Sequence, residues 1–171
     1  LITVNTTFAP RLAHRYSFSE SAGATCCADS IGAAHARILS KTTNTSRFES
    51  GQLWLPGGPD IASQPQSPYA YVDLPDGIIS SKGEMTVETW ANVDAYQVNY
   101  FGWTRLFDFG SNAVNYLFLC PRAGNSFAPA YVLRAAATLN GNINETRLNW
   151  TNSLPTNVQS HVVFTYSPSQ R

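Results

Sequence analysis

The sequence has few charged side chains, and those present cancel. Charged residues make up 13% of the 171 residues, with 11 basic and 11 acidic side chains. Such a surface offers no electrostatic attraction for nucleic acid or for an anionic membrane. No apolar run approaches the ~20 residues needed to cross a bilayer, so we expect no membrane span. The hydrophobic share of 43% predicts one globular domain over residues 1–171.

Motifs for catalysis are also missing. The sequence contains neither a Gly-x-Ser-x-Gly nucleophile elbow nor a glycine-rich phosphate loop. His14, His35 and His161 are dispersed, without a cysteine or an acid at metal-ligand spacing. We therefore expect hydrogen-bonded structural histidines and no enzyme.

Cysteine is scarce, and the three residues are unevenly placed. Cys26 and Cys27 are adjacent, and neighbours bond each other only with strain. A disulfide from either of them to Cys120 is one prediction, which would leave one thiol for a partner chain. Three thiols in a reducing compartment are the alternative.

The sequons, the low charge and the polar loops favour a secreted protein that carries glycans, and the start of the sequence bears on processing. The sequence begins at Leu1 without a signal-peptide pattern, which favours a processed chain or part of a longer one. Low charge and loops rich in Asn, Thr and Ser also favour an extracellular location. Asn-x-Ser/Thr sequons occur at Asn5, Asn44, Asn144 and Asn149.

Alternating hydrophobicity predicts short strands through most of the chain. In Met85–Val93, the residues Met85 and Val87 share one face, and Glu88 and Trp90 share the other. This two-faced pattern is typical of antiparallel sheets in a β-sandwich or jelly roll. Only Ile31–Leu39 has helical composition, and we interpret it as a turn or short helix. The other expected strands are His14–Phe18, Gly51–Leu55, Tyr69–Leu74, Thr104–Phe109, Tyr116–Cys120, Tyr131–Ala136 and His161–Tyr166.

Sequence blocks in a fixed order resemble the laminin-G-like branch of the concanavalin A-like lectin/glucanase domains. They are Leu12–Gly32 with its Asp-Ser-x-Gly turn, Phe48–Asp60 with Tyr69–Ser80, the Thr-Val-Glu-Thr-Trp strand Thr86–Trp90, and Gln159–Arg171. The resemblance implies an all-β, two-sheet antiparallel jelly-roll sandwich, and it implies no particular function.

The end of the sequence departs from the family pattern. In the family, a strand like His161–Tyr166 is followed by a hairpin return strand, whereas this sequence reaches Arg171 in the preceding turn. An unpaired edge would remain. We expect the rest of a larger polypeptide, or a partner chain adding a strand, to complete the fold.

The resemblance also suggests where a cofactor and a catalytic pair would lie. Relatives hold Ca²⁺ with Asp carboxylates, which makes Asp29 the first candidate ligand, with Asp76 and Asp108 behind it. The alternative for Asp29 is an Asx turn. Glu84, Glu88 and Asp94 are the nearest match to a glycosidase carboxylate pair, but Thr86 interrupts the glucanase pattern, so Glu88 beside Trp90 is interpreted as structural.

The loop between two expected strands has the composition of a sugar site. Tyr96, Tyr100 and Trp103 would stack on pyranose rings, and Gln97 and Asn99 would bond hydroxyl groups. In the alternative, Phe101 and Trp103 fold back over the core.

The leading hypothesis is a non-catalytic extracellular adhesion or assembly module that acts through protein–protein contacts. A lectin module using residues 96–103 is the alternative, and a glycoside hydrolase is a distant third.

Overall fold

In the computed structural model the described residues are 10–40, 46–56, 70–94, 103–110, 114–124 and 131–167, and within these ranges the chain forms strands and no helix. All strand pairs are antiparallel, which confirms the prediction of an all-β fold built from antiparallel sheets. Consequently none of the described segments provides a helix long and apolar enough to cross a membrane. The strands are β1 (Cys26–Cys27), β2 (Ala36–Ser40), β3 (Arg47–Glu49), β4 (Gln52–Trp54), β5 (Ala70–Asp73), β6 (Met85–Ala91), β7 (Phe107–Gly110), β8 (Tyr116–Ala123), β9 (Val132–Thr138), β10 (Thr146–Asn149) and β11 (Ser160–Tyr166).

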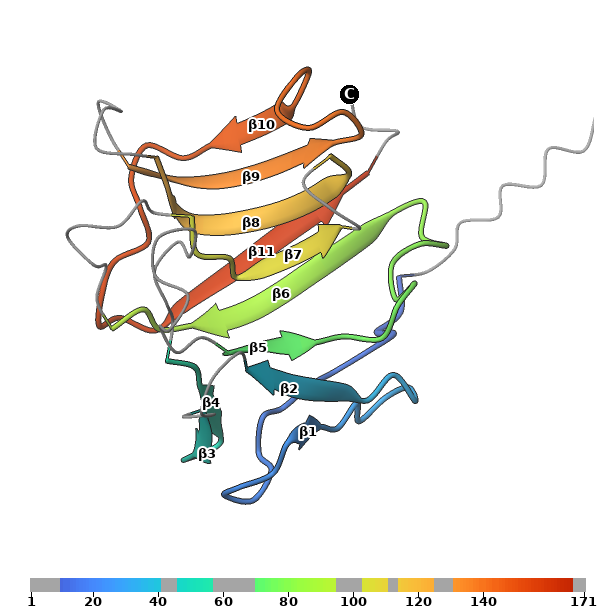
Figure 1. Cartoon of the computed structure of the whole chain (residues 1–171), viewed down its shortest axis with the longest axis vertical. Helices are drawn as coiled ribbons and strands as arrows, with labels where there is room; N and C mark the ends of the chain where they lie inside the picture. Colours follow the sequence, from blue (N-terminus) through green and yellow to red (C-terminus); the bar gives the residue numbers. More distant parts are fainter. Residues whose placement is uncertain are drawn as a thin grey trace, which may run out of the picture. The chain divides into compact units, whose positions relative to one another are not determined.

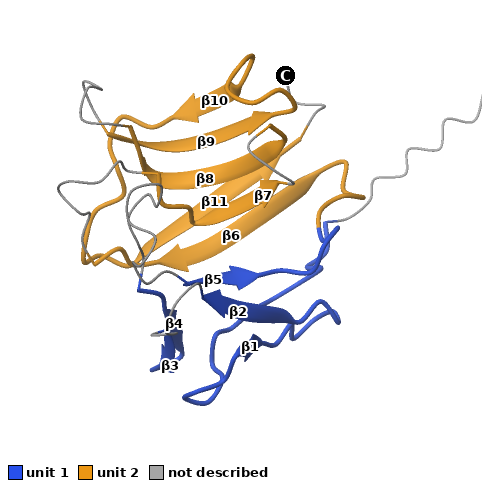
Figure 2. Cartoon of the chain, viewed as in Figure 1, with its two compact units in different colours: residues 1–56, 68–78 blue, residues 57–67, 79–171 orange. Residues whose placement is uncertain are grey.

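The chain divides into two compact units, coloured separately in Figure 2. Unit 1 comprises residues 1–56 and 68–78, and unit 2 comprises residues 57–67 and 79–171. Each unit is described by itself, and the single-domain organisation stays a prediction.

Unit 1 contains a three-stranded sheet in the order β1-β2-β5 and the separate hairpin β3-β4. The hairpin closes through Ser50 and Gly51, with φ of 53° and 71°. Two consecutive positive φ values give the turn whose twist matches that of the flanking strands. The core of the unit gathers the buried side chains of Cys27, Ala36, Ile38 and Phe48.

Unit 2 contains a four-stranded sheet, β10-β9-β8-β7, and a two-stranded sheet, β11-β6 (Figure 1). The two sheets pack through Leu119, Ala135 and Val162, with Phe107 and Phe164 edge-on at 5.6 Å between ring centroids. We call the side of the four-stranded sheet that faces β11 its inner face. A second cluster, centred on Phe118 and Cys120, covers the outer face.

Several sequence-based strand predictions are confirmed and others are wrong. The runs that begin at Met85, Tyr116 and His161 form strands, as expected. The helical interpretation of Ile31–Leu39 is wrong, because Ala36–Leu39 lies in β2 with alternate side chains buried. His14–Phe18 makes only an isolated bridge, between Tyr16 and Asp29.

None of the three cysteines forms a disulfide, so the predicted bridge has no support. In β1 the pleat sends Cys26 to solvent and Cys27 into the core of unit 1, because successive side chains of a strand point to opposite faces. Burial, with smaller contributions from Glu20 and Cys26, raises the pKa of Cys27 to about 11. Burial also raises the pKa of Cys120 in unit 2.

Candidate interaction surfaces

One row of side chains crosses all four strands of the larger sheet on its inner face. Phe107, Leu119, Ala135 and Leu148 lie directly opposite one another in successive ladders. Opposite residues in a ladder project to the same face. Leu119 is 4% exposed and Ala135 is 8% exposed, both packed against Val162 of β11, whereas Leu148 is 67% exposed. β11 therefore shields the inner-face side chains of β8 and β9 from solvent, but it does not shield Leu148 of β10.

Trp150 extends this uncovered strip along the same edge. Its N–H donates to the Leu133 carbonyl at 2.8 Å, so the pairing with β9 extends to Trp150. The Leu133 N–H donates to the Asn152 carbonyl at 2.9 Å, so the register shifts after Trp150. Two residues beyond Leu148, the Trp150 side chain returns to the inner face. Trp150 is 69% exposed. We call Leu148 and Trp150 the inner-face patch, an apolar surface that continues the core but lies in water.

Beside this patch, β11 has an open edge. β11 pairs with β6 along all of Ser160–Tyr166, and no other described strand pairs with β11. Figure 1 shows β11 crossing behind the four-stranded sheet, whose far edge is β10. In an antiparallel pair, every second residue turns its N–H and C=O away from its partner strand. The N–H and C=O groups of β11 that point away from β6 are the ones that could form hydrogen bonds with an added strand.

The outward face of the β6–β11 sheet carries an exposed aromatic plate. The rings of Trp90 and His161 stack at 4.1 Å with an interplanar angle of 11°. Glu88 Oε2 lies 3.5 Å from His161 Nε2, and Val163 is opposite Glu88 in the ladder. Trp90 is 61% exposed. Glu88 and Trp90 of β6 thus both contact His161 of β11, and the stacked Trp90 and His161 rings present a flat surface to solvent.

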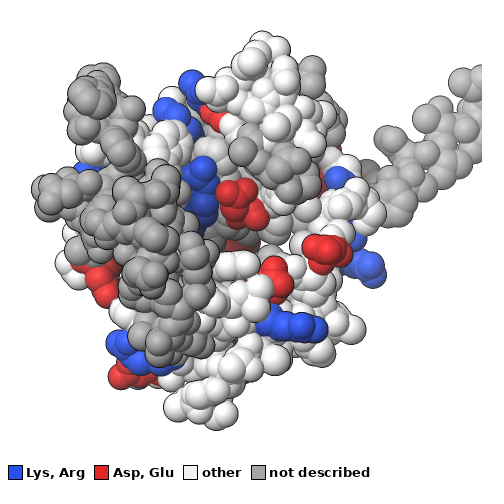
Figure 3. Space-filling view, viewed as in Figure 1, with Lys and Arg blue, Asp and Glu red and all other residues white. Residues whose placement is uncertain are grey.

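The outer face of the four-stranded sheet carries arginines on aromatic rings. The Arg105 guanidinium lies 3.7 Å from the Phe118 ring centroid, and the Arg134 guanidinium lies 5.4 Å from that of Trp103. Arg105 Nε also bonds Asp108 Oδ2 at 3.2 Å. On the face seen in Figure 3, the basic and acidic side chains of the described residues are interspersed. The charges of Arg105 and Arg134 therefore interact with aromatic rings of the same cluster, and that of Arg105 also with Asp108.

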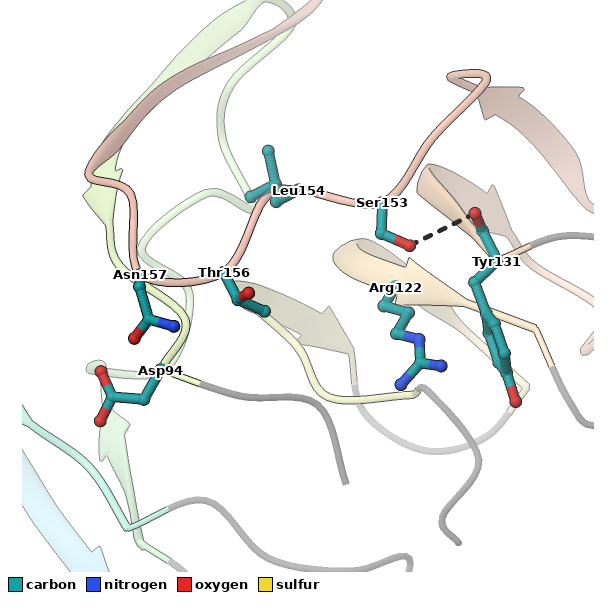
Figure 4. Close-up of a pocket in the computed structure, with 7 residues that line it drawn as sticks. All are labelled: Asp94, Arg122, Tyr131, Ser153, Leu154, Thr156 and Asn157. Atoms are coloured by element: carbon teal, nitrogen blue, oxygen red, sulfur yellow. Dashed lines mark hydrogen bonds between the residues drawn. The ribbon is translucent and has the colours of Figure 1, made fainter. Parts of the chain in front are cut away.

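An open hollow of about 570 Å³ lies where the loop before β11 meets the ends of β6 and β8. The Arg122 guanidinium stacks 3.7 Å from the Tyr131 ring centroid, and Ser153 Oγ donates to the Tyr131 carbonyl at 3.3 Å. Figure 4 shows Asp94 and Asn157 on one side, with Arg122 and Tyr131 on the other. Hydroxyl, amide and charged groups around one ring suit a polar, hydroxylated ligand. The lining residues are Asp94, Arg122, Tyr131, Ser153, Leu154, Thr156 and Asn157.

The first candidate calcium ligand, Asp29, is fully engaged with the chain itself. Its buried carboxylate accepts hydrogen bonds from His14 Nδ1 and from the N–H groups of Arg15, Ile31, Gly32 and Ala34. Burial raises the pKa of Asp29, but the bonds from Gly32, His14, Arg15 and Ile31 outweigh it and hold the pKa well below its ordinary value. A side chain at Gly32 would place a Cβ 2.7 Å from Asp29 Oδ2. Hydrogen bonds from backbone N–H groups to the Asp29 carboxylate are what the Asx-turn alternative predicts.

The other two candidate ligands, Asp76 and Asp108, belong to different units of the chain. Asp76 is exposed in the turn after β5, and Asp108 is bonded to Arg105. Among the residues described, no three His, Cys, Asp or Glu side chains are grouped to hold a metal ion. Calcium binding therefore stays a prediction that the geometry does not strengthen.

The predicted sugar-binding loop is only partly visible. Tyr96, Gln97, Asn99 and Tyr100 lie outside the described residues, as do the sequons at Asn5 and Asn44. Trp103 is half-buried and meets the Phe118 ring edge-on at 6.3 Å, which favours the packing alternative for this residue. The sequons at Asn144 and Asn149 are exposed.

The three candidate catalytic carboxylates occupy three different settings. Glu84 accepts a hydrogen bond from Ser167 Oγ at 2.6 Å. Glu88 lies on the outward face beside His161, and Asp94 lines the hollow.

Comparison of the chain with protein-family models, curated proteins and solved structures found no match. The function is therefore inferred from the surfaces of the chain itself. Sequence reasoning missed Leu148 and Trp150, although large apolar residues at i and i+2 in an otherwise polar run were a signal of a strand with one apolar face. Arg122 and Tyr131 gave no such signal, because they lie nine positions apart in the sequence.

Proposed function

We propose that the chain is a non-catalytic, extracellular assembly module that acts through protein–protein contacts. Its fold in this proposal is the laminin-G-like jelly-roll sandwich that the sequence blocks resemble. The observation that carries the proposal is the inner-face patch: Leu148 and Trp150 are 67% and 69% exposed on the side of the sheet where their neighbours form the core. An apolar surface continuous with a core is the type of surface that a protein partner covers.

Two further features support the proposal. The exposed sequons at Asn144 and Asn149 agree with an extracellular location. The outward plate of Trp90 and His161 offers a second contact surface, because aromatic residues are enriched at the centres of interfaces.

Site-specific photo-crosslinking in the native host tests the proposal. A photoreactive residue at position 148 is expected to cross-link to a companion polypeptide or to a further segment of the parent chain. Leu139, which is 86% exposed in the turn after β9, provides the matched control position. Equal labelling from both positions, or none from position 148, would overturn the proposal.

A lectin is the second candidate, and the polar hollow favours it. In this alternative Arg122 and Tyr131 bind a glycan together with Thr156 and Asn157. The lectin predicts glycan-array binding that Arg122→Ala abolishes, and Trp103→Ala measures any contribution of the aromatic loop of residues 96–103. The assembly module predicts no glycan signal.

A further inference from the structure

We infer that copies of this chain stack head to tail, with the outward face of the β6–β11 sheet of one copy against the outer face of the four-stranded sheet of the next. The inner faces of the two sheets pack on each other, so these two faces point away from each other within unit 2. The inference rests on the proposed assembly function but uses other surfaces than the inner-face patch. For both faces the partner is a second copy of the chain.

The outward face of the β6–β11 sheet is acidic and aromatic. Glu88 is joined on this face by His161, with 3.5 Å between Glu88 Oε2 and His161 Nε2, and the imidazole compensates the carboxylate only when it is protonated. The Trp90 ring is stacked on one side by His161 and is 61% exposed, so ring surface remains for a cation. The six outward positions of the two strands include no Lys or Arg; they are Thr86, Glu88, Trp90, His161, Val163 and Thr165.

The outer face of the four-stranded sheet carries an excess of positive charge. Three arginines lie on it with two carboxylates. Arg105 pairs with Asp108 at 3.2 Å, and Arg147 pairs with Glu145. The third arginine, Arg134, is joined to no carboxylate among the described residues. This face therefore has the opposite sign to the face that carries Glu88.

Arg134 is the cation of this face that an incoming carboxylate would neutralise. It is half-buried, and its partners are neutral: the Asn149 Oδ1 atom at 2.8 Å and the Trp103 ring, 5.4 Å from the guanidinium. The parts of unit 2 outside the described ranges contain one acidic side chain, Asp60. A partly desolvated guanidinium without a counter-charge gains more from a carboxylate than a fully hydrated one does.

The signs of the two faces determine which surfaces meet. Two copies that met through the same face would place Glu88 near Glu88 or Arg134 near Arg134, and like charges across an interface oppose association. Opposite faces bring Glu88 toward Arg134 and the Trp90 ring toward an arginine-rich surface. A contact between two different faces leaves one face of each kind free at the ends. It therefore repeats as an open stack unless the rotation between copies closes a ring.

Sedimentation equilibrium of the unaltered chain is the first test. The chain is prepared without glycans, because Asn149 lies beside Arg134 on the outer face. We expect the average mass to rise with concentration beyond that of a dimer. Association is expected to weaken about tenfold between roughly 0.1 M and 1 M salt, because the Debye length falls from ~10 Å to ~3 Å and the pairing charges are partly exposed.

Charge reversal tests which faces meet. Glu88→Arg gives a chain with two basic faces, and Arg134→Glu gives a chain with two acidic faces. Each variant alone is expected to associate at least about tenfold more weakly than the unaltered chain. An equimolar mixture is expected to regain association, because every contact then joins an acidic face to a basic one. Arg11→Glu, an exposed position in unit 1, is the matched control and is expected to associate as the unaltered chain does.

Several outcomes would overturn the stacking. They are a mass that stays monomeric at millimolar chain, a mass that stops at a dimer, single variants that associate normally, and a mixture of folded variants that does not recover. Circular dichroism shows whether each variant is folded. If one is not, Glu88→Gln and Arg134→Gln replace the reversals, and unchanged association of both overturns the inference. If position 148 still cross-links specifically in the native host, the assembly module stands and only the stacking fails. If that cross-link is absent too, both fail.

Discussion

The same substitution at two positions of one sheet row is expected to have very different effects on stability. Leu119 and Leu148 both project to the inner face, but they are 4% and 67% exposed. Leu119→Ala removes a buried side chain and leaves a cavity, which typically costs about 2–5 kcal/mol. Full burial of a leucine contributes about 1.5–3 kcal/mol, and only about a third of Leu148 is shielded, so Leu148→Ala is expected to cost roughly 0.5–1 kcal/mol.

Urea unfolding followed by tryptophan fluorescence separates these two outcomes. Three of the four tryptophans, Trp90, Trp103 and Trp150, lie in unit 2 and Trp54 lies in unit 1, so most of the signal reports on the unit that carries both substitutions. With a slope of about 1–3 kcal/mol per molar urea, Leu119→Ala is expected to move the midpoint by about 1–3 M, and Leu148→Ala by a few tenths. If Leu148→Ala costs as much as Leu119→Ala, Leu148 is covered in the free chain and the inner-face patch does not exist.

Three further predictions concern unit 1. The pKa of Asp29 is depressed in the folded state, so its ionised carboxylate stabilises the fold above the unfolded pKa of about 3.9, and this contribution is lost as pH falls. Asp29→Asn is expected to flatten the acid limb of a stability–pH profile, and an unchanged limb contradicts this. Gly32→Ala is expected to lower the melting temperature, because its Cβ would lie 2.7 Å from Asp29 Oδ2; Gly23→Ser, with no atom within 4 Å of the added Cβ but a φ of 85°, provides a comparison of backbone strain alone. With iodoacetamide at pH 8, exposed Cys26 is expected to react at least tenfold faster than buried Cys27, whose pKa is raised to about 11; equal rates by peptide mapping would show that β1 opens readily.

Strands with a contrast between their faces could be predicted from the sequence. Met85–Ala91 and Ser160–Tyr166 alternate between half-buried or buried and exposed positions, and their period-2 pattern identified them. Ala36–Ser40 was missed because its buried positions include alanine, whose small side chain and high helix propensity hide the alternation. Thr146–Asn149 was missed because Leu148 is its only apolar residue, so the alternation becomes apparent only with Trp150 beyond the end of the strand.

The interaction surfaces were less predictable than the strands. Whether Leu148 is covered depends on how far β11 reaches across a sheet assembled from residues 107–149, and that is a long-range property. Trp103 illustrates the same limit, because its composition suits sugar stacking, while its position against Phe118 and Arg134 is set by strands distant in the sequence.

Because side chains alternate along β10, a glycan on this strand and the inner-face patch would lie on opposite faces of the sheet. Asn149 accepts a hydrogen bond from Arg134 Nε at 2.8 Å and lies on the outer face, whereas its neighbours Leu148 and Trp150 point inward. A glycan on this sequon would be attached through Nδ2, which leaves Oδ1 as the acceptor of that hydrogen bond, and would occupy the outer side of the edge strand. It would act as a steric shield on one side only, blocking stacking of molecules through the outer face while leaving the apolar side accessible. Sugar attachment and docking of a partner would then be compatible on adjacent residues of a single strand.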